Sequence, residues 1–209
     1  MPFNTKKITG SVREYYTQKV LSHGAIPLGV DWNSRQSQEL RFEQLLKIVP
    51  FTEKFSLMDW GCGYGALYGY LKRKKIAFSY QGYDLSGEMI RRARIAYGKA
   101  PSTSFKVGSP GGARADYALA SGIFNVRLGT SNADWKGYLL AILQGMDRAS
   151  RKGFSFNCLT KYSDKKRMRV DLYYADPLFV FDYCKRRFSR NVALLHDYGL
   201  YEFTILVRK

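Results

Sequence analysis

The chain has 209 residues, which is enough for one domain with a sizeable core and too few for two ordinary ones. Hydrophobic residues make up 45% and charged residues 24% of it, which excludes extensive disorder, and no apolar run approaches the length of a membrane span. The formal net charge of +17 allows an anionic partner, although the Lys and Arg residues are spread over several elements and a solvated surface accounts for them equally well.

Two further features of the composition concern compartment and metals. The polar start MPFNTKKITG lacks the apolar core of a signal peptide, so we expect a cytoplasmic protein. The three cysteines, Cys62, Cys158 and Cys184, are an odd number without C-x-x-C spacing. This pattern argues against a disulfide framework and against a zinc site, so no metal is expected.

The N-terminal part of the chain, residues 1–50, has the pattern of two helices. Residues 11–24 place apolar and aromatic side chains at helical spacings, with Ser11 as the expected N-cap. A second amphipathic segment follows at 37–49. We therefore predict that residues 1–50 form a helical extension that packs over a core made by residues 51–209, within a single domain.

The stretch 55–67, FSLMDWGCGYGAL, predicts a strand, a tight turn and the start of a helix. Its apolar beginning suits a buried parallel strand that ends at Asp59. Gly61, Gly63 and Gly65 permit positive φ angles and let the backbone approach a ligand closely. The helical pattern resumes directly after them.

Two kinds of cofactor use such a turn. The spacing of Gly61, Gly63 and Ala66 fits the dinucleotide fingerprint, which would make the chain an NAD(P)-binding oxidoreductase. Asp59 favours another ligand, because a carboxylate repels a pyrophosphate but suits a ligand that carries an ammonium and a sulfonium group. S-adenosylmethionine is such a ligand, and DWGCGYG resembles motif I of the class I S-adenosylmethionine-dependent methyltransferases. The resemblance covers roughly residues 55–209.

A second acidic residue supports this interpretation. The segment 78–86, FSYQGYDLS, predicts a strand that ends at Asp84, about 20 residues beyond the glycines, where a carboxylate is well placed to accept hydrogen bonds from ribose hydroxyls. The alternative is that Asp84 caps the helix predicted at 86–98, with Ser86 as a competing cap. The resemblance implies the ribose-binding role.

The third and fourth strands are predicted at 103–108 and 116–126. Many family members have an acidic residue after the third strand that binds the adenine amine, whereas this chain has Ser109, so Ser109 or the backbone is expected to serve instead. The fourth strand delivers residues to the carboxyl edge of the sheet, where ligands of open α/β sheets bind. Phe124 could pack on a ligand there, or it could equally belong to the hydrophobic core. The resulting cofactor-binding candidates are Asp59, Gly61, Cys62, Gly63, Gly65, Asp84, Leu85, Ser109, Ser121, Gly122 and Phe124.

The C-terminal part predicts a helix at 135–149, a fifth strand at 154–160, an exposed insertion at 161–177, a helix at 177–189 and a terminal hairpin of strands at 191–198 and 201–209. A dinucleotide dehydrogenase would more often continue with another parallel crossover. The expected fold class is therefore α/β, a doubly wound, mostly parallel seven-stranded sheet with an antiparallel C-terminal hairpin and an N-terminal helical cap, as in the class I methyltransferases.

Within that family the chain resembles the small-molecule branch, in which an N-terminal helical cap covers the acceptor pocket. The adenine-modifying branch carries an Asn/Asp-Pro-Pro-aromatic element after the fourth strand, whereas this chain has SGIFN. The cytosine-modifying branch needs a cysteine in a Pro-Cys context, and none is present. An RNA-modifying methyltransferase, or a nucleic-acid-binding protein that uses the basic surface, is the second interpretation.

Methyl transfer from a sulfonium is an in-line displacement, so the protein mainly binds and aligns two reactants, and a catalytic base is optional. His23 and His196, the only histidines, are the candidates for acting on the acceptor. The acceptor-binding candidates are Tyr15, Tyr16, Trp32, Arg41, Asn125 and Arg169. Arg41, together with Arg169 or Arg167, would clamp an anionic acceptor through paired hydrogen bonds. The alternative is that Arg41 pairs with a glutamate of its own helix and that Arg167 and Arg169 are solvated.

Overall fold

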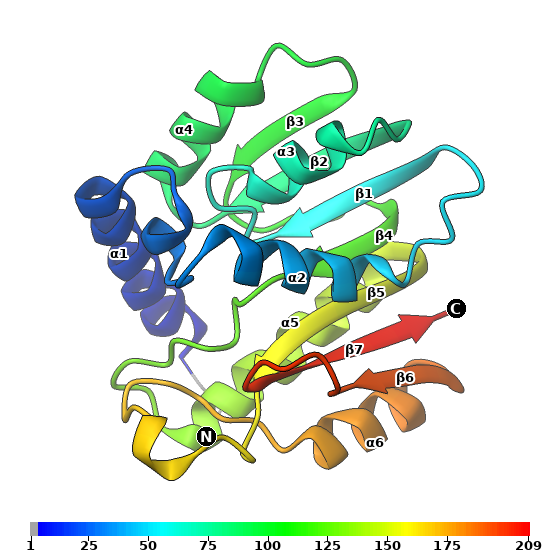
Figure 1. The fold of residues 1–209 in the computed structure, drawn as a ribbon. Helices are drawn as coiled ribbons and strands as arrows, with labels where there is room; N and C mark the ends of the chain where they lie inside the picture. Colours follow the sequence, from blue (N-terminus) through cyan, green and yellow to red (C-terminus); the bar gives the residue numbers. More distant parts are fainter. Residues whose placement is uncertain (1–3) are drawn as a thin grey trace.

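The computed structural model describes residues 4–209, which form one seven-stranded sheet in the order β3-β2-β1-β4-β5-β7-β6 (Figure 1). The strands are β1 (Phe55–Trp60), β2 (Phe78–Asp84), β3 (Thr103–Val107), β4 (Ala115–Ala120), β5 (Ser150–Leu159), β6 (Asn191–Leu195) and β7 (Glu202–Arg208). β7 runs antiparallel to β5 and β6, and the other neighbouring strands are parallel. The predicted fold class is confirmed.

Helices cover both faces of the sheet. They are α1 (Thr5–His23), η1 (Pro27–Val30), α2 (Arg35–Leu46), α3 (Ala66–Arg73), α4 (Gly87–Tyr97), α5 (Asn132–Ala149), η2 (Lys165–Arg167) and α6 (Pro177–Arg187). The apolar sides of α2, α3 and α4 share one core with the sheet, and those of α5 and α6 share a second core with its other face. Each strand of the sheet centre is therefore buried on both sides, as its continuous apolar sequence predicts.

The first helix is longer than its apolar pattern predicts. α1 begins at Thr5, not near Ser11, because the side chain of Asn4 accepts a hydrogen bond from the backbone N–H of Lys7 at 3.0 Å and so caps the helix. The added turns carry mostly polar, exposed residues, and only Ile8 among them is buried. Hydrophobic periodicity therefore gives no signal there.

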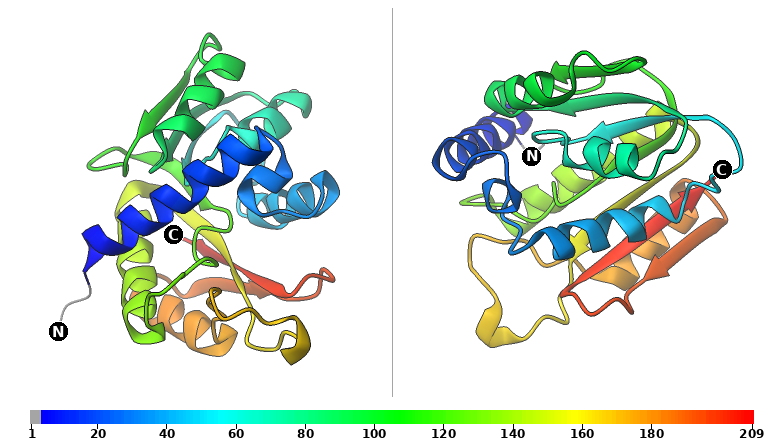
Figure 2. Two further views of the ribbon diagram at one scale, coloured as in Figure 1. Left: turned by 90° about the vertical axis from the view of Figure 1, so that its left-hand side faces the viewer. Right: turned by 45° about the horizontal axis from the view of Figure 1, so that its top comes forward.

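α1 lies across the carboxyl edge of the sheet, as the two further views show (Figure 2). Its C-terminal half contacts η1 and α4, and the hydroxyl groups of Thr17 and Ser86 are hydrogen-bonded at 2.8 Å. Lys19 forms an ion pair with Asp31 at 2.7 Å. These contacts hold α1 over the edge at which the parallel strands β1, β2 and β4 end.

The predicted insertion at 161–177 is mostly irregular and exposed, and η2 is its one short helix. Two isolated bridges, Val126 with Leu172 and Thr160 with Ala175, attach it to the rest of the fold. Over the described residues 4–209, no helix has both the length and the apolar character needed to cross a bilayer.

Candidate functional site

A hollow lies between α1 and the carboxyl edge of the sheet, and we call it the edge pocket. The strands and their loops contribute Asp59, Trp60, Gly61, Cys62, Gly63, Tyr83, Asp84, Leu85, Gly108, Ser109, Ser121, Gly122 and Ile123 to its lining. Helices α1 and α5 contribute Thr5, Thr9, Val12, Arg13, Tyr16, Tyr138 and Ile142. The pocket thus extends from the glycine turn to the space between α1 and α5.

The glycine turn (residues 61–65) is held open by backbone hydrogen bonds. The N–H groups of Gly61 and Cys62 both donate to the carbonyl of Tyr83, at 2.7 and 2.9 Å. Gly61 has a φ of 82°, and a Cβ there would lie 2.2 Å from the side chain of Ile123. Only glycine therefore fits this position, and the turn leaves backbone facing the pocket.

Asp84 is oriented by the backbone on both of its oxygens. Oδ2 accepts a hydrogen bond from the N–H of Gly63 at 2.9 Å, and Oδ1 accepts one from the N–H of Ser86 at 2.8 Å. Burial raises the pKa of Asp84 to about 6, although these two hydrogen bonds oppose the shift. Ser86 caps α4 by accepting from the N–H of Met89, so Asp84 remains at the pocket wall.

Asp59 lies deeper, with 2% of its surface exposed, and accepts a hydrogen bond from the hydroxyl of Tyr80. Burial raises its pKa to about 7, and the bond from Tyr80 lowers it in part. The sequence analysis missed Tyr80. A hint in the sequence is Gly82 inside the predicted strand, because a glycine in a strand often marks a place where other groups pack closely. In the structure a Cβ on Gly82 would lie 2.8 Å from Cys62 Sγ and 3.0 Å from the Tyr80 ring.

The loop after β4 divides its predicted residues between pocket and core. Ser121 and Gly122 line the edge pocket, and the Ser121 hydroxyl is buried without a hydrogen-bond partner among the described residues. Phe124 is fully buried in the core instead, with its ring centroid 5.6 Å from that of Phe156. Asn125 also lies outside the pocket, where its Oδ1 accepts from the N–H of Leu159 at 3.1 Å.

Gly65 does not line the pocket either. It is the N-cap of α3, with a φ of 85°, and a Cβ there would lie 3.0 Å from the ring of Tyr97. The turn therefore requires glycine at this position for packing. Leu85 and Ser109, by contrast, are part of the lining, and their role in binding a cofactor stays a prediction.

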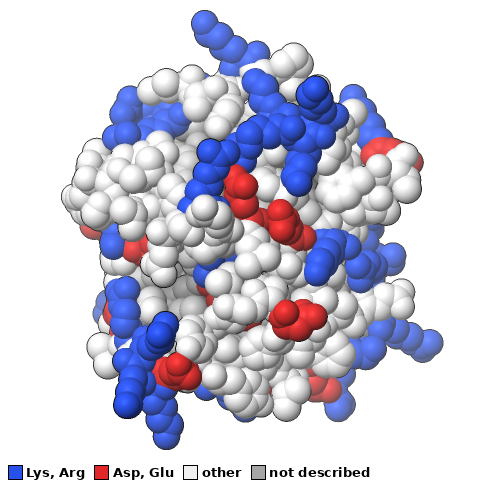
Figure 3. Space-filling model, in the orientation of Figure 1, with Lys and Arg blue, Asp and Glu red and all other residues white. Residues whose placement is uncertain are grey.

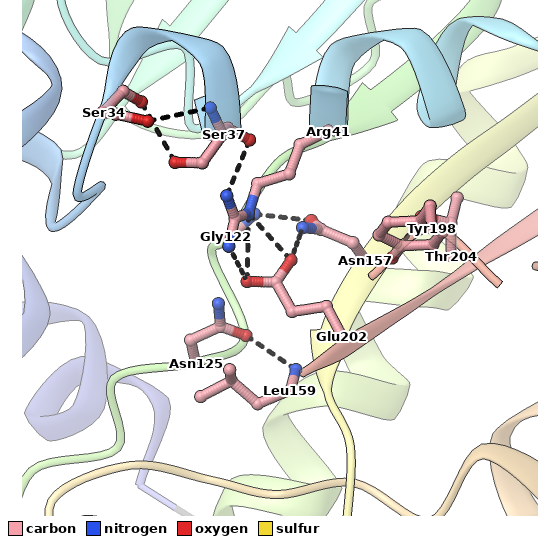
Figure 4. A network of polar contacts seen from close by, with 10 residues as sticks. All are labelled: Ser34, Ser37, Arg41, Gly122, Asn125, Asn157, Leu159, Tyr198, Glu202 and Thr204. Carbon is pink, nitrogen blue, oxygen red and sulfur yellow. Dashed lines mark hydrogen bonds and ion pairs between the residues drawn. The ribbon is translucent and has the colours of Figure 1, made fainter. Parts of the chain in front are cut away.

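Arg41 is committed to a buried network (Figure 4). Its Nε and Nη2 donate to the carboxylate of Glu202 on β7, at 3.0 and 2.7 Å, and Nη1 donates to the carbonyl of Ser37 at 2.7 Å. Its guanidinium also lies 3.9 Å from the ring centroid of Trp32. Arg41 therefore neither clamps an acceptor nor pairs with a glutamate of its own helix.

The same network supports the pocket wall. Asn157 on β5 donates to Glu202 through Nδ2 and accepts from the N–H of Gly122 through Oδ1, at 2.7 Å (Figure 4). Trp32 lines the pocket, and a Cβ on Gly122 would lie 2.4 Å from its ring. Arg41 and Glu202, which do not line the pocket themselves, thus hold Trp32 and the β4 loop in place.

The two histidines lie outside the pocket. His23 is exposed at the C-terminal end of α1, whereas the pocket is lined by the N-terminal part of this helix. His196 is exposed after β6, with its ring beside those of Tyr162 and Phe203. The structure therefore places neither candidate base in the edge pocket.

Of the tyrosines predicted to bind the acceptor, Tyr16 lines the pocket and Tyr15 does not. Arg169 also lies outside, because it pairs with Asp171 through Nε at 3.0 Å and a second contact from Nη2. Arg167 lies over the ring of Tyr201, 5.7 Å from its centroid. The predicted arginine clamp is thus absent from the edge pocket.

The sequence analysis did not select several of the lining residues, Arg13 and Tyr138 among them. Arg13 is the only cationic side chain of the lining, and Tyr138 is a buried phenol on α5. Arg13 lies in the predicted helix at 11–24, one turn before Tyr16 on the same face, but the pattern does not show which face meets the pocket.

The chain was compared with protein-family models, curated proteins and solved structures. No family model matches it. A protein of Mycobacterium tuberculosis (strain ATCC 25618 / H37Rv) named "Putative methyltransferase Rv1506c" is 52% identical over 164 residues, which are 78% of this chain and 99% of that protein.

Solved structures with the same fold are far more distant in sequence. The magnesium protoporphyrin IX methyltransferase ChlM from Synechocystis PCC 6803 with bound SAM has a TM-score of 0.67 at 13% identity, and the match covers 96% of this chain and 97% of that one. The DhpI-SAM-HEP complex has a TM-score of 0.67 at 11% identity and covers 99% of this chain and 100% of that one. At these identities the likeness concerns the fold.

Proposed function

The chain belongs to the class I S-adenosylmethionine-dependent methyltransferases, and we propose that it transfers the methyl group to a small molecule held between α1 and α5. The observation that carries this proposal is the continuity of the edge pocket. One hollow runs from Asp84 and the glycine turn, at the strand ends, to Tyr138 on α5, and α1 covers it. A covered pocket of this kind admits a small acceptor more readily than a folded polymer.

The residues at the sheet end of the pocket fit this cofactor. Asp84 has lone pairs free for ribose hydroxyls beyond the two that the backbone uses. The unpartnered hydroxyl of Ser121 and the open backbone at Gly61 supply further polar groups. We assign Asp59 to the positive end of the cofactor, and Leu85 and Ser109 to the adenosine side.

When bound, S-adenosylmethionine supplies an electrophilic methyl group, whose bond to sulfur breaks as the bond to the acceptor forms. The protein contributes alignment and exclusion of water, because α1 closes the pocket and Trp32 and Ile123 line it. No histidine reaches the pocket, and its carboxylates, Asp59 and Asp84, lie at the cofactor end. We therefore propose that the acceptor loses its proton to water and not to a dedicated base.

A nucleic-acid acceptor is the second candidate, and the observation that favours it is the charge of +17. Figure 3 shows Lys and Arg side chains in several groups over one face, with Asp and Glu between them. Binding through such groups would weaken steeply as salt rises, because counterions are released from the nucleic acid. A filter-binding assay with RNA and DNA across a range of salt concentrations tests this alternative.

Titration calorimetry tests the proposed function. We expect binding of S-adenosylmethionine and S-adenosylhomocysteine and none of NAD(H) or NADP(H). A methyl-release screen over small metabolites and RNA, followed by formation of S-adenosylhomocysteine, then identifies the acceptor class. Turnover of RNA with no turnover of any small molecule would replace the first candidate by the second.

A further inference from the structure

This inference rests on the proposed function and concerns the end of the edge pocket between α1 and α5. Tyr138 lines this end with only 5% of its surface exposed. No hydrogen bond joins its hydroxyl to another of the residues 4–209, and burial of the residue raises its pKa to about 12. The phenol is therefore neutral at physiological pH and offers a hydrogen-bond donor to whatever occupies the pocket.

A single cation faces the same end of the pocket. Arg13 lines the pocket from α1 and is exposed, and its guanidinium makes no ion pair or hydrogen bond within the described part of the chain. The arginines that the sequence analysis selected, Arg41 and Arg169, are both paired with acidic residues elsewhere. Arg13 is thus the one guanidinium available to an acceptor in this pocket.

Apolar side chains make up much of the remaining wall, to which Thr5, Thr9 and Tyr16 of α1 add hydroxyl groups. Val12 and Ile142 pack beside Tyr138 in one cluster, and Trp60 and Ile123 continue the lining toward the glycine turn. An acceptor that fits this wall has an apolar body. The single guanidinium of the lining matches one negative charge.

We propose that the acceptor is a small carboxylate with an apolar body, whose carboxylate is bound by the guanidinium of Arg13 and by the hydroxyl of Tyr138. Arg13 recognises the charge and Tyr138 donates to an oxygen. The two residues therefore make separable contributions to binding. A carboxamide of the same shape keeps the oxygen that Tyr138 binds and loses the charge that Arg13 binds.

The test uses the full-length protein saturated with S-adenosylhomocysteine, and matched acid and amide probes: hexanoate with hexanamide, and benzoate with benzamide. Titration calorimetry measures the affinity for each probe. We expect each acid to bind ~10-fold more tightly than its amide, which corresponds to one charge-assisted hydrogen-bonding contact. Failure to bind S-adenosylhomocysteine would contradict the proposed function. A failure of the acid and amide probes, with S-adenosylhomocysteine bound, would contradict the assignment of the acceptor end.

Two variants separate the two contacts. Arg13→Gln should abolish the preference for acid over amide, whereas Lys7→Gln, which removes one charge from an exposed position of α1 outside the lining, should retain it. Tyr138→Phe should weaken the acid and the amide alike by ~10-fold, whereas Tyr117→Phe, at a buried tyrosine outside the pocket, should weaken neither. Equal binding of acid and amide by the unmodified protein, absence of binding by both, or an unchanged preference in Arg13→Gln would overturn the proposal.

Discussion

Arg41 on α2 and Glu202 on β7, which are 161 positions apart in the sequence, form a buried ion pair with an Nη2 to Oε1 distance of 2.7 Å. The pair joins the N-terminal part of the chain to its last strand. It also supports Trp32 on one side and, through Asn157, the backbone of Gly122 on the other. The shape of the edge pocket thus depends on a contact that lies outside it.

We expect Glu202→Ala to lower the free energy of unfolding by about 3–5 kcal/mol, because it leaves the Arg41 charge buried without its partner. Glu39→Ala removes a partly exposed carboxylate that pairs with Arg35 and Arg73, and should cost no more than about 1 kcal/mol. Urea denaturation measures both. Equal effects of the two substitutions would contradict a structural role for the buried pair.

Asp59 should make the stability of the ligand-free protein depend on pH. Its carboxyl ionises near pH 3.8 in the unfolded chain and near 7 in the folded one, so its stabilising contribution is complete below pH 4 and is lost as the pH rises toward 7. Asp59→Asn removes this dependence. We expect the variant to gain about 2–3 kcal/mol of stability relative to the unmodified protein between pH 5 and pH 8.

Denaturation of both proteins at pH 5 and pH 8 checks this expectation. The amide oxygen of the variant can still accept the hydrogen bond from Tyr80, so the comparison isolates the charge. A difference between the two proteins that does not change with pH would mean that the carboxyl is ionised throughout.

Asp84→Ala should weaken S-adenosylhomocysteine binding by about 10- to 100-fold, which is the loss expected when a charged hydrogen-bond acceptor is removed. Asp182→Ala is the matched control, because this carboxylate is exposed on α6 and pairs only with Arg186. Titration calorimetry compares the two. An unchanged affinity in Asp84→Ala would remove this residue from the cofactor site.

Gly122→Ala should both destabilise the protein and weaken ligand binding. The φ of Gly122 is 75°, and the new Cβ would lie 2.4 Å from the ring of Trp32, which lines the pocket. Gly111→Ala introduces the same kind of backbone strain, because the φ of Gly111 is 59°, but its new Cβ would have no atom within 4 Å. We expect Gly111→Ala to cost about 1–2 kcal/mol and Gly122→Ala about 1–3 kcal/mol more.

Thermal or urea unfolding, together with titration of S-adenosylhomocysteine, measures both effects. If Gly122→Ala behaves like Gly111→Ala in both assays, then Trp32 moves without cost and does not shape the pocket.

Local pattern in the sequence indicated the strands, most of the helices and the glycine turn, and it selected the candidate cofactor residues at the strand ends. The order of strands and helices, the glycine turn, and Asp59, Asp84 and Ser121 all follow from residues that are close together in the chain or at a fixed position relative to a strand end. These signals are reliable because the carboxyl ends of parallel strands converge at one edge of the sheet. Gly65 illustrates the limit, since its positive φ serves packing against Tyr97.

Partner choice and side-chain direction were decided only by the tertiary structure. Arg41 pairs with Glu202 across the sheet, Phe124 packs into the core, and His196 lies in the exposed segment after β6. Arg13 lies in the predicted helix, and it reaches the pocket because α1 crosses the sheet edge. Hydrophobic periodicity indicates which face of an element is buried. Which distant side chain meets that face depends on how the elements pack together, and this packing forms the end of the edge pocket between α1 and α5.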